Sequence, residues 1–273
     1  MKRPGAGSSA MSPCRAWGTP PYSVALVHGG PGAPGEMATV ARELSATCGV
    51  LEPFQSATSV AGQVEELAAQ LRAHANAPVV LVGFSWGVML ALLAAAAHAD
   101  LVKRLVLVGS GPLDPAYAGG IAKARLARLP PEDRGEFVRL QRALEGTAPS
   151  AGDLARYGEL CARADAVDPV YPVPQEFPPD PEIHRLVWSE AATLRASGYF
   201  VEQARLVACP IAVIHGENDP HPFEGVFEPL HAAGVSPRVH VLTACGHTPW
   251  IERRARERFF ALLRQELVAP VRP

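Results

Sequence analysis

The sequence GFSWG occupies Gly83–Gly87 and stands between a short apolar run, Pro78–Val82, and an Ala-rich apolar segment, Trp86–Ala97. Such a run is typical of a strand that is covered on both faces of a parallel sheet, and the longer segment predicts a buried helix. Glycines on both sides of the serine let a strand and a helix approach without a Cβ clash. This stretch therefore predicts a sharp strand-to-helix turn with Ser85 at its tip, in strained backbone geometry.

Short β-branched runs alternate with longer helical patterns from Tyr22 onward, which predicts parallel strands joined by crossover helices. The predicted strands are Ser23–Val27, Gly49–Phe54, Pro78–Val82, Arg104–Val108, Ile211–Ile214 and Arg238–Leu242. The predicted helices are Glu36–Ala46, Val60–Ala75, Trp86–Ala97, Pro222–Ala233 and Pro249–Leu267. Because the runs VVLV and LVLV are apolar throughout, we expect their strands to be central. Ser59 is a candidate N-cap for the second helix.

Composition divides the chain into a leader, a core and an insertion. Residues 1–20 are rich in Gly, Ser and Pro without periodicity, which predicts a flexible leader. Residues 21–110 and 199–273 contain all the predicted strands and form the predicted α/β core. Strand patterns are missing from residues 111–198, where helix-forming stretches and crowded prolines predict an inserted helical lid.

Length and composition restrict the class of protein. The 273 residues fit one large α/β unit, and 48% hydrophobic with 19% charged residues argue against a disordered chain. A formal net charge of −2 without a basic stripe argues against a nucleic-acid partner. The five cysteines are scattered without a CxxC pair, which favours a reducing compartment over a disulfide framework or a zinc site.

Neither a membrane span nor an export signal is expected. The most apolar window, Trp86–Ala97, is roughly half of the ~20 residues that a membrane-spanning helix needs. The stretch after Met1 lacks the apolar segment of a secretory signal. The sequence thus predicts a cytoplasmic protein with a small-molecule or short-peptide substrate, without a nucleic-acid or membrane partner, and it leaves the oligomeric state open.

Ser85 is the candidate nucleophile. A serine hydroxyl is a poor nucleophile alone, so the turn must aim it at a general base, and the adjoining helix N-terminus favours the negative charge that develops during attack. The alternative is a Gly-rich turn whose serine only caps the helix.

The sequence HGGPG at His28–Gly32 ends the first predicted strand. Glycines let the main chain approach a reacting group closely, so this loop can present backbone N–H groups to an oxyanion. The candidate donors are Gly29 and Gly30, together with Trp86 directly after the nucleophile. The alternative is a simple Gly-Pro turn with His28 as an ordinary residue at the strand end.

The candidate acid and base also follow strands. Asp219 lies in HGENDP after the run IAVI, and His247 lies in CGHTP after RVHVL. Because the carboxyl ends of parallel strands meet at one sheet edge, we expect both side chains near Ser85, in the chain order serine, acid, histidine. Taken singly, each could be a turn or surface residue. Competing acids are Asp100, Asp114 and Glu217, and competing bases are His28, His215, His221 and His240.

No recognised metal-ligand spacing and no glycine-rich nucleotide loop follows any predicted strand. We therefore expect neither a metal nor another cofactor.

These motifs together resemble the α/β-hydrolase fold, a mostly parallel central sheet with flanking helices and an inserted helical lid. HGGPG combined with a tryptophan after the nucleophile resembles the proline iminopeptidase branch in particular, and the match covers Tyr22–Leu267. The resemblance implies that Ser85, Asp219 and His247 form a catalytic triad.

The chain departs from the family pattern in three places. Few residues precede the HGGPG strand, so the first strands of the family sheet are expected to be missing or reduced. The lid is shorter than in typical members, and Phe84 replaces a usual glycine. In that family, lid carboxylates bind the free amino group of the substrate, and the resemblance implies Glu190 in VWSEA for this role. The alternative is a glutamate on a helix surface.

The sequence therefore predicts a serine hydrolase that cleaves a small amide or ester through an acyl-enzyme, most like a proline iminopeptidase. Two alternatives are a carboxylesterase with the same triad and a ligand-binding module that keeps the fold with little turnover.

Overall fold

The structure is a computed structural model, and it describes residues 14–146, 150–173 and 175–270. Its centre is a seven-stranded sheet in the order β1-β3-β2-β4-β5-β6-β7. The strands are β1 (Cys14–Trp17), β2 (Tyr22–Val27), β3 (Gly49–Pro53), β4 (Val79–Phe84), β5 (Val102–Val108), β6 (Ile211–Gly216) and β7 (Arg238–Leu242). All neighbours are parallel except β1 and β3. The mostly parallel sheet is confirmed, and the strands that carry VVLV and LVLV, β4 and β5, lie inside it.

Strand β1 corrects part of the flexible leader predicted over residues 1–20. Cys14–Trp17 pair with β3, and Arg15 donates two hydrogen bonds to the buried Glu52 carboxylate, at 2.9 and 2.7 Å. A four-residue edge strand with a charged side chain has no alternating pattern of its own, so contacts distant in sequence decide its conformation. Residues 1–13 lie outside the described residues.

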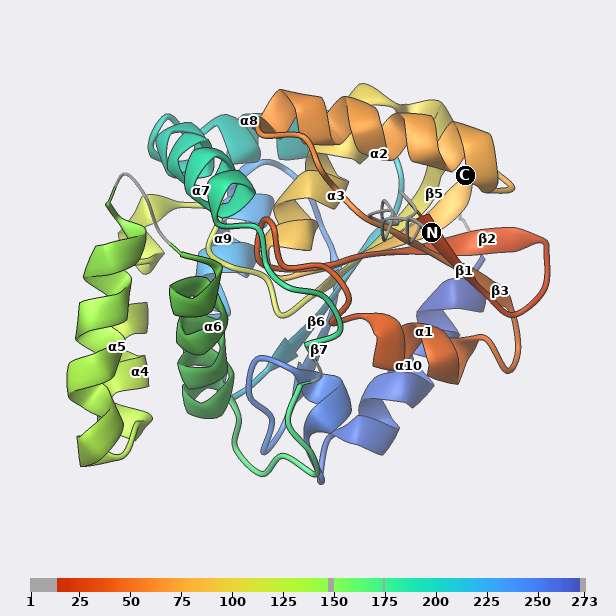
Figure 1. The fold of residues 1–273 in the computed structure, drawn as a ribbon. Coiled ribbons are helices and arrows are strands. Elements are labelled where there is room, and N and C mark those ends of the chain that lie inside the picture. The colour runs from red at the N-terminus through yellow and green to blue at the C-terminus, as the bar shows by residue number, and fades with distance from the viewer. Residues whose placement is uncertain (1–13, 147–149, 174, 271–273) are drawn as a thin grey trace, which may run out of the picture.

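Helices cover both faces of the sheet (Figure 1). On one face lie α1 (Ala38–Leu44) and α10 (Arg256–Val268). On the other lie α2 (Val60–His74), α3 (Trp86–Ala97), α8 (Tyr199–Ala204) and α9 (Glu224–Ala232). Three short 3-10 helices are η1 (Ala99–Leu101), η2 (Pro115–Tyr117) and η3 (Pro249–Ile251). In β4, Val80 and Val82 pack into the first layer and Leu81 into the second, which explains why the strand is apolar at every position.

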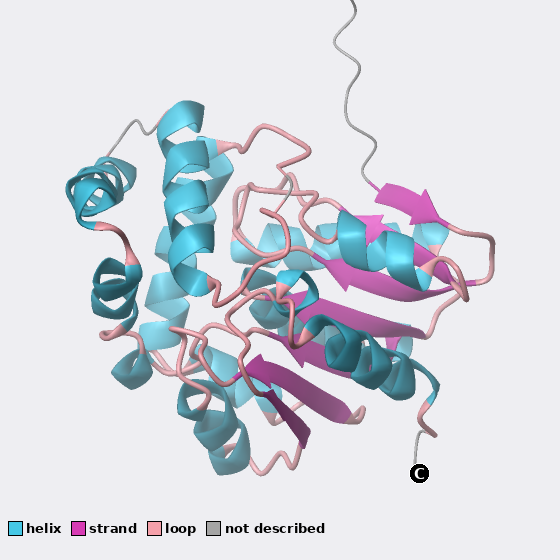
Figure 2. Ribbon diagram, turned by 90° about the horizontal axis from the view of Figure 1, so that it is seen from below, coloured by secondary structure: helices cyan, strands magenta, loops and turns pink. Residues whose placement is uncertain are grey.

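The described part of residues 111–198 contains helices and no strand of the sheet. The helices are α4 (Ile121–Arg128), α5 (Pro131–Leu144), α6 (Ala151–Asp165) and α7 (Pro181–Ala196). Helices α4 to α6 gather at one side of the molecule (Figures 1 and 2) and share a small apolar cluster that includes Phe137 and Leu160. Helix α7 packs on the main core through Ile183, Val187 and Ala191. None of the helices in the described ranges has both the length and the apolar character needed to span a bilayer.

Candidate active site

Ser85 lies between the end of β4 and the start of α3, at φ 53° and ψ −116°. A positive φ is strained for a residue with a Cβ, and such strain is concentrated at functional sites. Ser85 occupies the N-cap position of α3, but its side chain makes no capping hydrogen bond to the helix. Its backbone N–H donates to Val108 O at 3.1 Å, which ties the turn to the end of β5.

The two glycines beside Ser85 permit the close packing that the sequence predicted. A Cβ on Gly83 would overlap the backbone of Gly87, and a Cβ on Gly87 would overlap the carbonyl oxygens of Val27 and His28. Helix α3 therefore starts in direct contact with the end of β2. This contact brings the HGGPG loop beside the serine.

Asp219 and His247 are joined directly. The loop after β6 presents Asp219, the loop after β7 presents His247, and His247 Nδ1–H donates to Asp219 Oδ2 at 2.7 Å. Burial alone would raise the pKa of Asp219, but the facing His247 and His221 hold it well below its usual value. Burial alone would lower the pKa of His247, but Asp219 raises it above its usual value. The buried carboxylate thus fixes the ring with Nε2 as the free acceptor.

Ser85 and His247 meet the same segment of backbone. Val108 O accepts the Ser85 N–H, and the next residue, Gly109, packs on the histidine loop so closely that a Cβ would lie 3.3 Å from His247 Nδ1. No hydrogen bond joins Ser85 Oγ to His247 or to another residue that the structure describes. The Phe84 ring at the end of β4 packs beside the His247 ring, and the two ring centroids are 4.9 Å apart.

Two of the competing histidines lie beside Asp219: His215 Nε2 is 3.6 Å from Asp219 Oδ2, and His221 makes the closer contacts. Its backbone N–H and its Nδ1–H both donate to Asp219 Oδ1, each at 2.8 Å. Its ring lies 4.3 Å from that of His247. Burial, assisted by the positive charge of His247, lowers the pKa of His221 to about 4, so this ring is neutral. One sequence signal points to this contact: an Asp side chain often accepts the backbone N–H of the residue two positions later, which here is His221.

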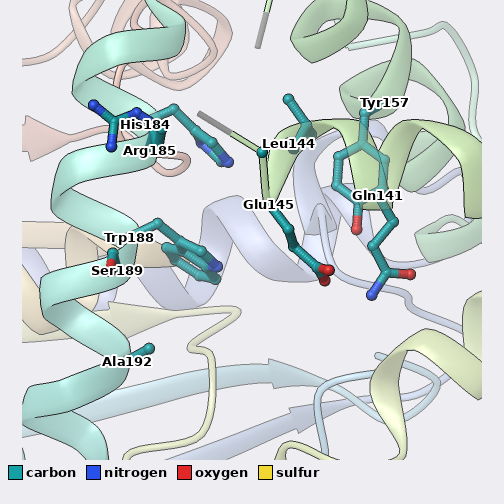
Figure 3. A pocket seen from close by; sticks show the side chains of 10 residues that line it. Gln141, Leu144, Glu145, Tyr157, His184, Arg185, Trp188, Ser189 and Ala192 are labelled. Carbon is teal, nitrogen blue, oxygen red and sulfur yellow. The ribbon is translucent and has the colours of Figure 1, made fainter. Parts of the chain in front are cut away.

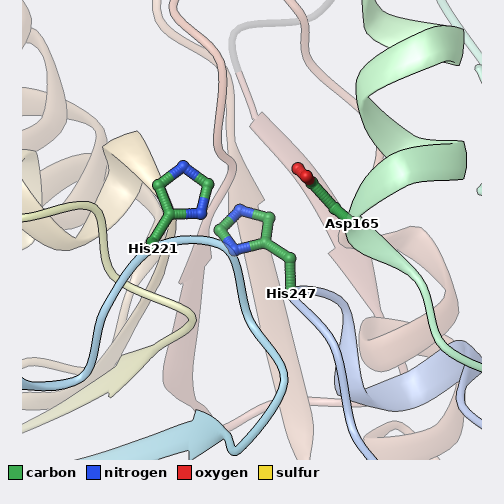
Figure 4. Close-up of side chains that lie close together, drawn as sticks. All are labelled: Asp165, His221 and His247. Atoms are coloured by element: carbon green, nitrogen blue, oxygen red, sulfur yellow. The ribbon is translucent and has the colours of Figure 1, made fainter. Parts of the chain in front are cut away.

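Asp165 at the end of α6 adds a carboxylate beside the two rings (Figure 4). Ligand atoms of Asp165, His221 and His247 lie within 4.8 Å of one another, a spacing that could hold a metal ion. However, Arg125 of α4 binds both oxygens of Asp165, at 2.7 and 2.6 Å, and its Nη2 lies 3.4 Å from His221 Nε2. The guanidinium already supplies the positive charge beside this carboxylate. We interpret the group as an ion-pair network between helices α4 and α6 and the histidine loop.

The end of α6 is also attached to the histidine loop through the backbone. His247 N–H donates to Asp165 O at 2.9 Å. The buried Glu252 carboxylate accepts the N–H groups of Val167, Asp168 and Gly246, at 2.9, 2.8 and 3.0 Å. The segment that leaves α6 therefore helps to hold the catalytic histidine candidate in place.

The three oxyanion candidates differ in availability. Gly29 N–H donates to the carboxylate of Glu36, whereas Gly30 N–H and Trp86 N–H make no hydrogen bond within the described ranges. Gly30 and Trp86 are therefore the pair that can bind an oxyanion, and Gly29 is already engaged. His28, a competing base in sequence terms, is buried and donates Nδ1–H to Gly29 O at 2.7 Å, and burial lowers its pKa to about 4.

Glu190 lies on α7 but has a structural partner. Its Oε2 accepts the backbone N–H of Val60 at 2.8 Å, at the first turn of α2. Ser59 Oγ accepts Gly62 N–H at 3.1 Å, which confirms Ser59 as the N-cap. These two side chains thus accept two of the N–H groups in the first turn of α2. The resemblance could not predict this, because the contact joins residues 130 positions apart.

A pocket of about 440 Å³ lies between α7, the end of α5 and the middle of α6 (Figure 3). It is lined by Gln141, Leu144, Glu145, Gly146, Tyr157, His184, Arg185, Trp188, Ser189 and Ala192. Its α7 wall contacts the core on both sides of Ser85. The Trp188 and Trp86 rings lie 6.4 Å apart between centroids, and His184 Nδ1 donates to Pro31 O at 3.3 Å. The pocket is therefore adjacent to the nucleophile turn and to the HGGPG loop.

Comparison with known proteins agrees with the fold. The family model described as the alpha/beta hydrolase fold matches residues 4–253. Among solved structures, VinJ is similar over 93% of both chains, with a TM-score of 0.67 and 21% identity. A mutant of the meta-cleavage product hydrolase CumD from Pseudomonas fluorescens IP01, complexed with acetates, matches 92% of this chain and 91% of its own, with a TM-score of 0.61 and 20% identity.

A third structure, E-2-(acetamidomethylene)succinate hydrolase, matches 94% of both chains, with a TM-score of 0.61 and 18% identity. At these identities the likeness concerns the fold. The comparison with curated protein sequences gave no match.

Proposed function

Since the chain belongs to the α/β-hydrolase fold family, we propose that it is a serine hydrolase that cleaves a small amide or ester through an acyl-enzyme. The observation that carries this proposal is the hydrogen bond between Asp219 and His247 at the sheet edge where Ser85 stands in a strained turn. A serine, an imidazole and a buried carboxylate match the roles of nucleophile, general base and orienting acid.

The proposed reaction has two halves. His247 Nε2 takes the hydroxyl proton while Ser85 Oγ attacks the substrate carbonyl carbon, and the N–H groups of Gly30 and Trp86 bind the oxygen that becomes negative. Collapse of the tetrahedral intermediate breaks the bond to the leaving amine or alcohol, which receives the proton from His247. Water then attacks the acyl carbon with His247 again as base, which releases the acid and restores Ser85. Asp219 stays ionised throughout and stabilises the imidazolium.

Substrate binding has one geometric requirement in this proposal. Ser85 Oγ must come within hydrogen-bond reach of His247 Nε2 when the pocket is filled. Catalytic hydrogen bonds are often absent or long in free enzymes and tighten in the complex. Rotation about the Cα–Cβ bond of Ser85 moves the hydroxyl without disturbing the backbone of the turn.

Labelling with a fluorophosphonate tests the proposal. Wild-type protein is expected to react covalently, and Ser85→Ala is expected to lose the adduct while it keeps its far-ultraviolet circular dichroism. A folded wild-type protein that does not react would favour a ligand-binding module with little turnover. An adduct that persists in Ser85→Ala would place the nucleophile elsewhere.

We propose an aminoacyl amide as the substrate class, in line with the HGGPG and tryptophan motifs. The pocket volume suits a small molecule or a short peptide. The carboxylate available for a substrate amino group is that of Glu145, which lines the pocket, since Glu190 is engaged at α2.

The matched pair Glu145→Gln and Glu190→Gln tests this choice with proline arylamide and short acyl esters as substrates. Glu145→Gln is expected to raise KM for the arylamide and leave KM for the esters unchanged, and Glu190→Gln is expected to change neither. Turnover of esters with an inert arylamide would favour a carboxylesterase with the same triad.

A further inference from the structure

Glu36 carries a half-buried carboxyl group near the proposed nucleophile, and the proposed mechanism does not use it. It lies in the turn between the HGGPG loop and α1, and its Oε1 accepts the backbone N–H of Gly29. A Cβ built on Gly29 would lie 2.5 Å from Glu36 Oε1 and 2.9 Å from Ser85 Cβ. The carboxyl group and the serine side chain therefore flank the same glycine.

The HGGPG loop is held at its other end by the lid. Gly32 O accepts the N–H of Asp180 at 2.7 Å, directly before α7, and Pro31 O accepts His184 Nδ1–H at 3.3 Å. These bonds fix the carbonyl groups of the second half of the loop. Glu36 supplies the matching restraint on the first half, where the restrained group is an N–H.

We propose that Glu36 is a positioning residue for the oxyanion hole, and this inference rests on the proposed function. By accepting Gly29 N–H, the carboxyl group fixes the peptide between His28 and Gly29 and leaves the next N–H, that of Gly30, free for the substrate oxygen. Without this acceptor, the glycine pair can rotate between two N–H arrangements, because glycine lacks the steric restriction of other residues. The donor to the oxyanion would then be aligned in only part of the molecules.

The surroundings of Glu36 agree with a group that accepts a hydrogen bond without needing a full charge. Burial raises its pKa to about 7, against the effects of Gly29 N–H and His247, with a further increase from Glu52. Both forms of a carboxyl group can accept an N–H. The acceptor function therefore persists through neutral pH.

Three substitutions at Glu36 separate acceptor, charge and volume. Glu36→Gln keeps an acceptor oxygen, Glu36→Ala removes the side chain, and Glu36→Met fills the space without an acceptor. Removal of one oxyanion donor typically costs about 10²- to 10³-fold in turnover, so loss of its alignment should cost up to about 10²-fold. We expect Glu36→Ala and Glu36→Met to lower kcat by that amount with KM within about threefold of wild type, and Glu36→Gln to restore kcat to within about threefold.

A trifluoromethyl ketone analogue of the substrate gives the readout that a merely structural role would not move. Its adduct with Ser85 carries an oxyanion, so its inhibition constant should rise in Glu36→Ala and Glu36→Met in proportion to the loss of kcat/KM. Glu43→Ala, a substitution on the outer side of α1 where the glutamate pairs with Arg264, is the control and should leave both quantities unchanged.

The outcomes separate the inference from the proposed function. If wild-type protein resists fluorophosphonate, the proposed function fails and the inference fails with it. If wild type reacts at Ser85 but Glu36→Met keeps kcat and inhibitor affinity, or Glu36→Gln loses as much as Glu36→Met, the inference alone is overturned. Glu36→Gln and Glu36→Met have nearly the volume of glutamate, so they remain informative if Glu36→Ala fails to fold.

Discussion

Replacement of Asp219 by Asn should inactivate the protein by turning one histidine ring into the wrong tautomer. The carboxylate accepts three N–H groups from two histidines: two from His221 at Oδ1, both at 2.8 Å, and one from His247 at Oδ2, at 2.7 Å. An amide has only one oxygen. It is expected to turn that oxygen toward the two donors of His221, which leaves the NH₂ group facing His247 Nδ1.

His247 must then release the proton on Nδ1 and carry it on Nε2, where it can no longer accept the proton of Ser85. Loss of the correct tautomer in a triad lowers kcat by about 10⁴-fold, which corresponds to about 5.5 kcal/mol of transition-state stabilisation. The rate of fluorophosphonate labelling measures this effect without knowledge of the natural substrate.

The double variant Asp219→Asn with His221→Phe tests the reason for the loss. The second substitution removes one of the two donors at the Oδ1 position. Because a neutral hydrogen bond contributes about 1 kcal/mol, the amide oxygen should then face His247 more often. The labelling rate should therefore recover about fivefold relative to Asp219→Asn. The His221→Phe single variant is the reference for the second substitution. A double variant no faster than Asp219→Asn, or a loss below about 10²-fold in Asp219→Asn itself, would refute this account of the site.

Three further predictions concern stability. Arg125→Met removes the guanidinium that binds both oxygens of a buried carboxylate and should lower the free energy of unfolding by about 3–5 kcal/mol in urea titrations, whereas the exposed Arg253→Met should cost at most about 1 kcal/mol. Gly87→Ala places a Cβ against two carbonyl oxygens and should lower the melting temperature. Gly158→Ala, at an open position of α6, is the control and should stabilise the folded protein by about 0.5–1 kcal/mol. Equal melting temperatures of the two variants would contradict the close packing at Gly87. Burial lowers the pKa of His28 in the folded state to about 4, below its unfolded value near 6.5. The unfolded state therefore binds the additional proton, and stability is lost as the pH falls from about 6.5 to 4. Urea titrations over this pH range should show a decrease of about 3 kcal/mol in the free energy of unfolding of wild type that is missing in His28→Gln.

The parts of the site that could be predicted from sequence are those that follow strands. Ser85 directly follows β4, and Asp219 and His247 lie in the loops after β6 and β7. Parallel strands bring the residues that follow them to one edge of the sheet. Asp219 and His247 are in contact in the structure, and the inner position of β4 followed from its apolar run. Local pattern and sheet geometry are sufficient for these predictions.

The remaining contacts depend on closure of loops over long distances in the chain. Strand β1 was missed because Arg15 reaches Glu52 only after the sheet has formed. Glu36 was missed because a lone acid in a turn has no pattern, and its role comes from the direction of one N–H. Glu190 was assigned to the substrate by resemblance, whereas packing of α7 on α2 gives its carboxylate a different partner.

The attachment of the α6 exit to the histidine loop limits how this architecture can be rebuilt. The segment with α4 to α6 is a candidate for replacement by the corresponding segment of another protein, because these helices share their own apolar cluster. However, Asp165 O accepts the backbone N–H of His247, and the N–H groups of Val167 and Asp168 donate to the Glu252 carboxylate. A chimera that carries a foreign segment here should therefore keep the native residues from Asp165 to Asp168. A junction before Asp165 should retain catalysis, and a junction after Asp168 should lose it.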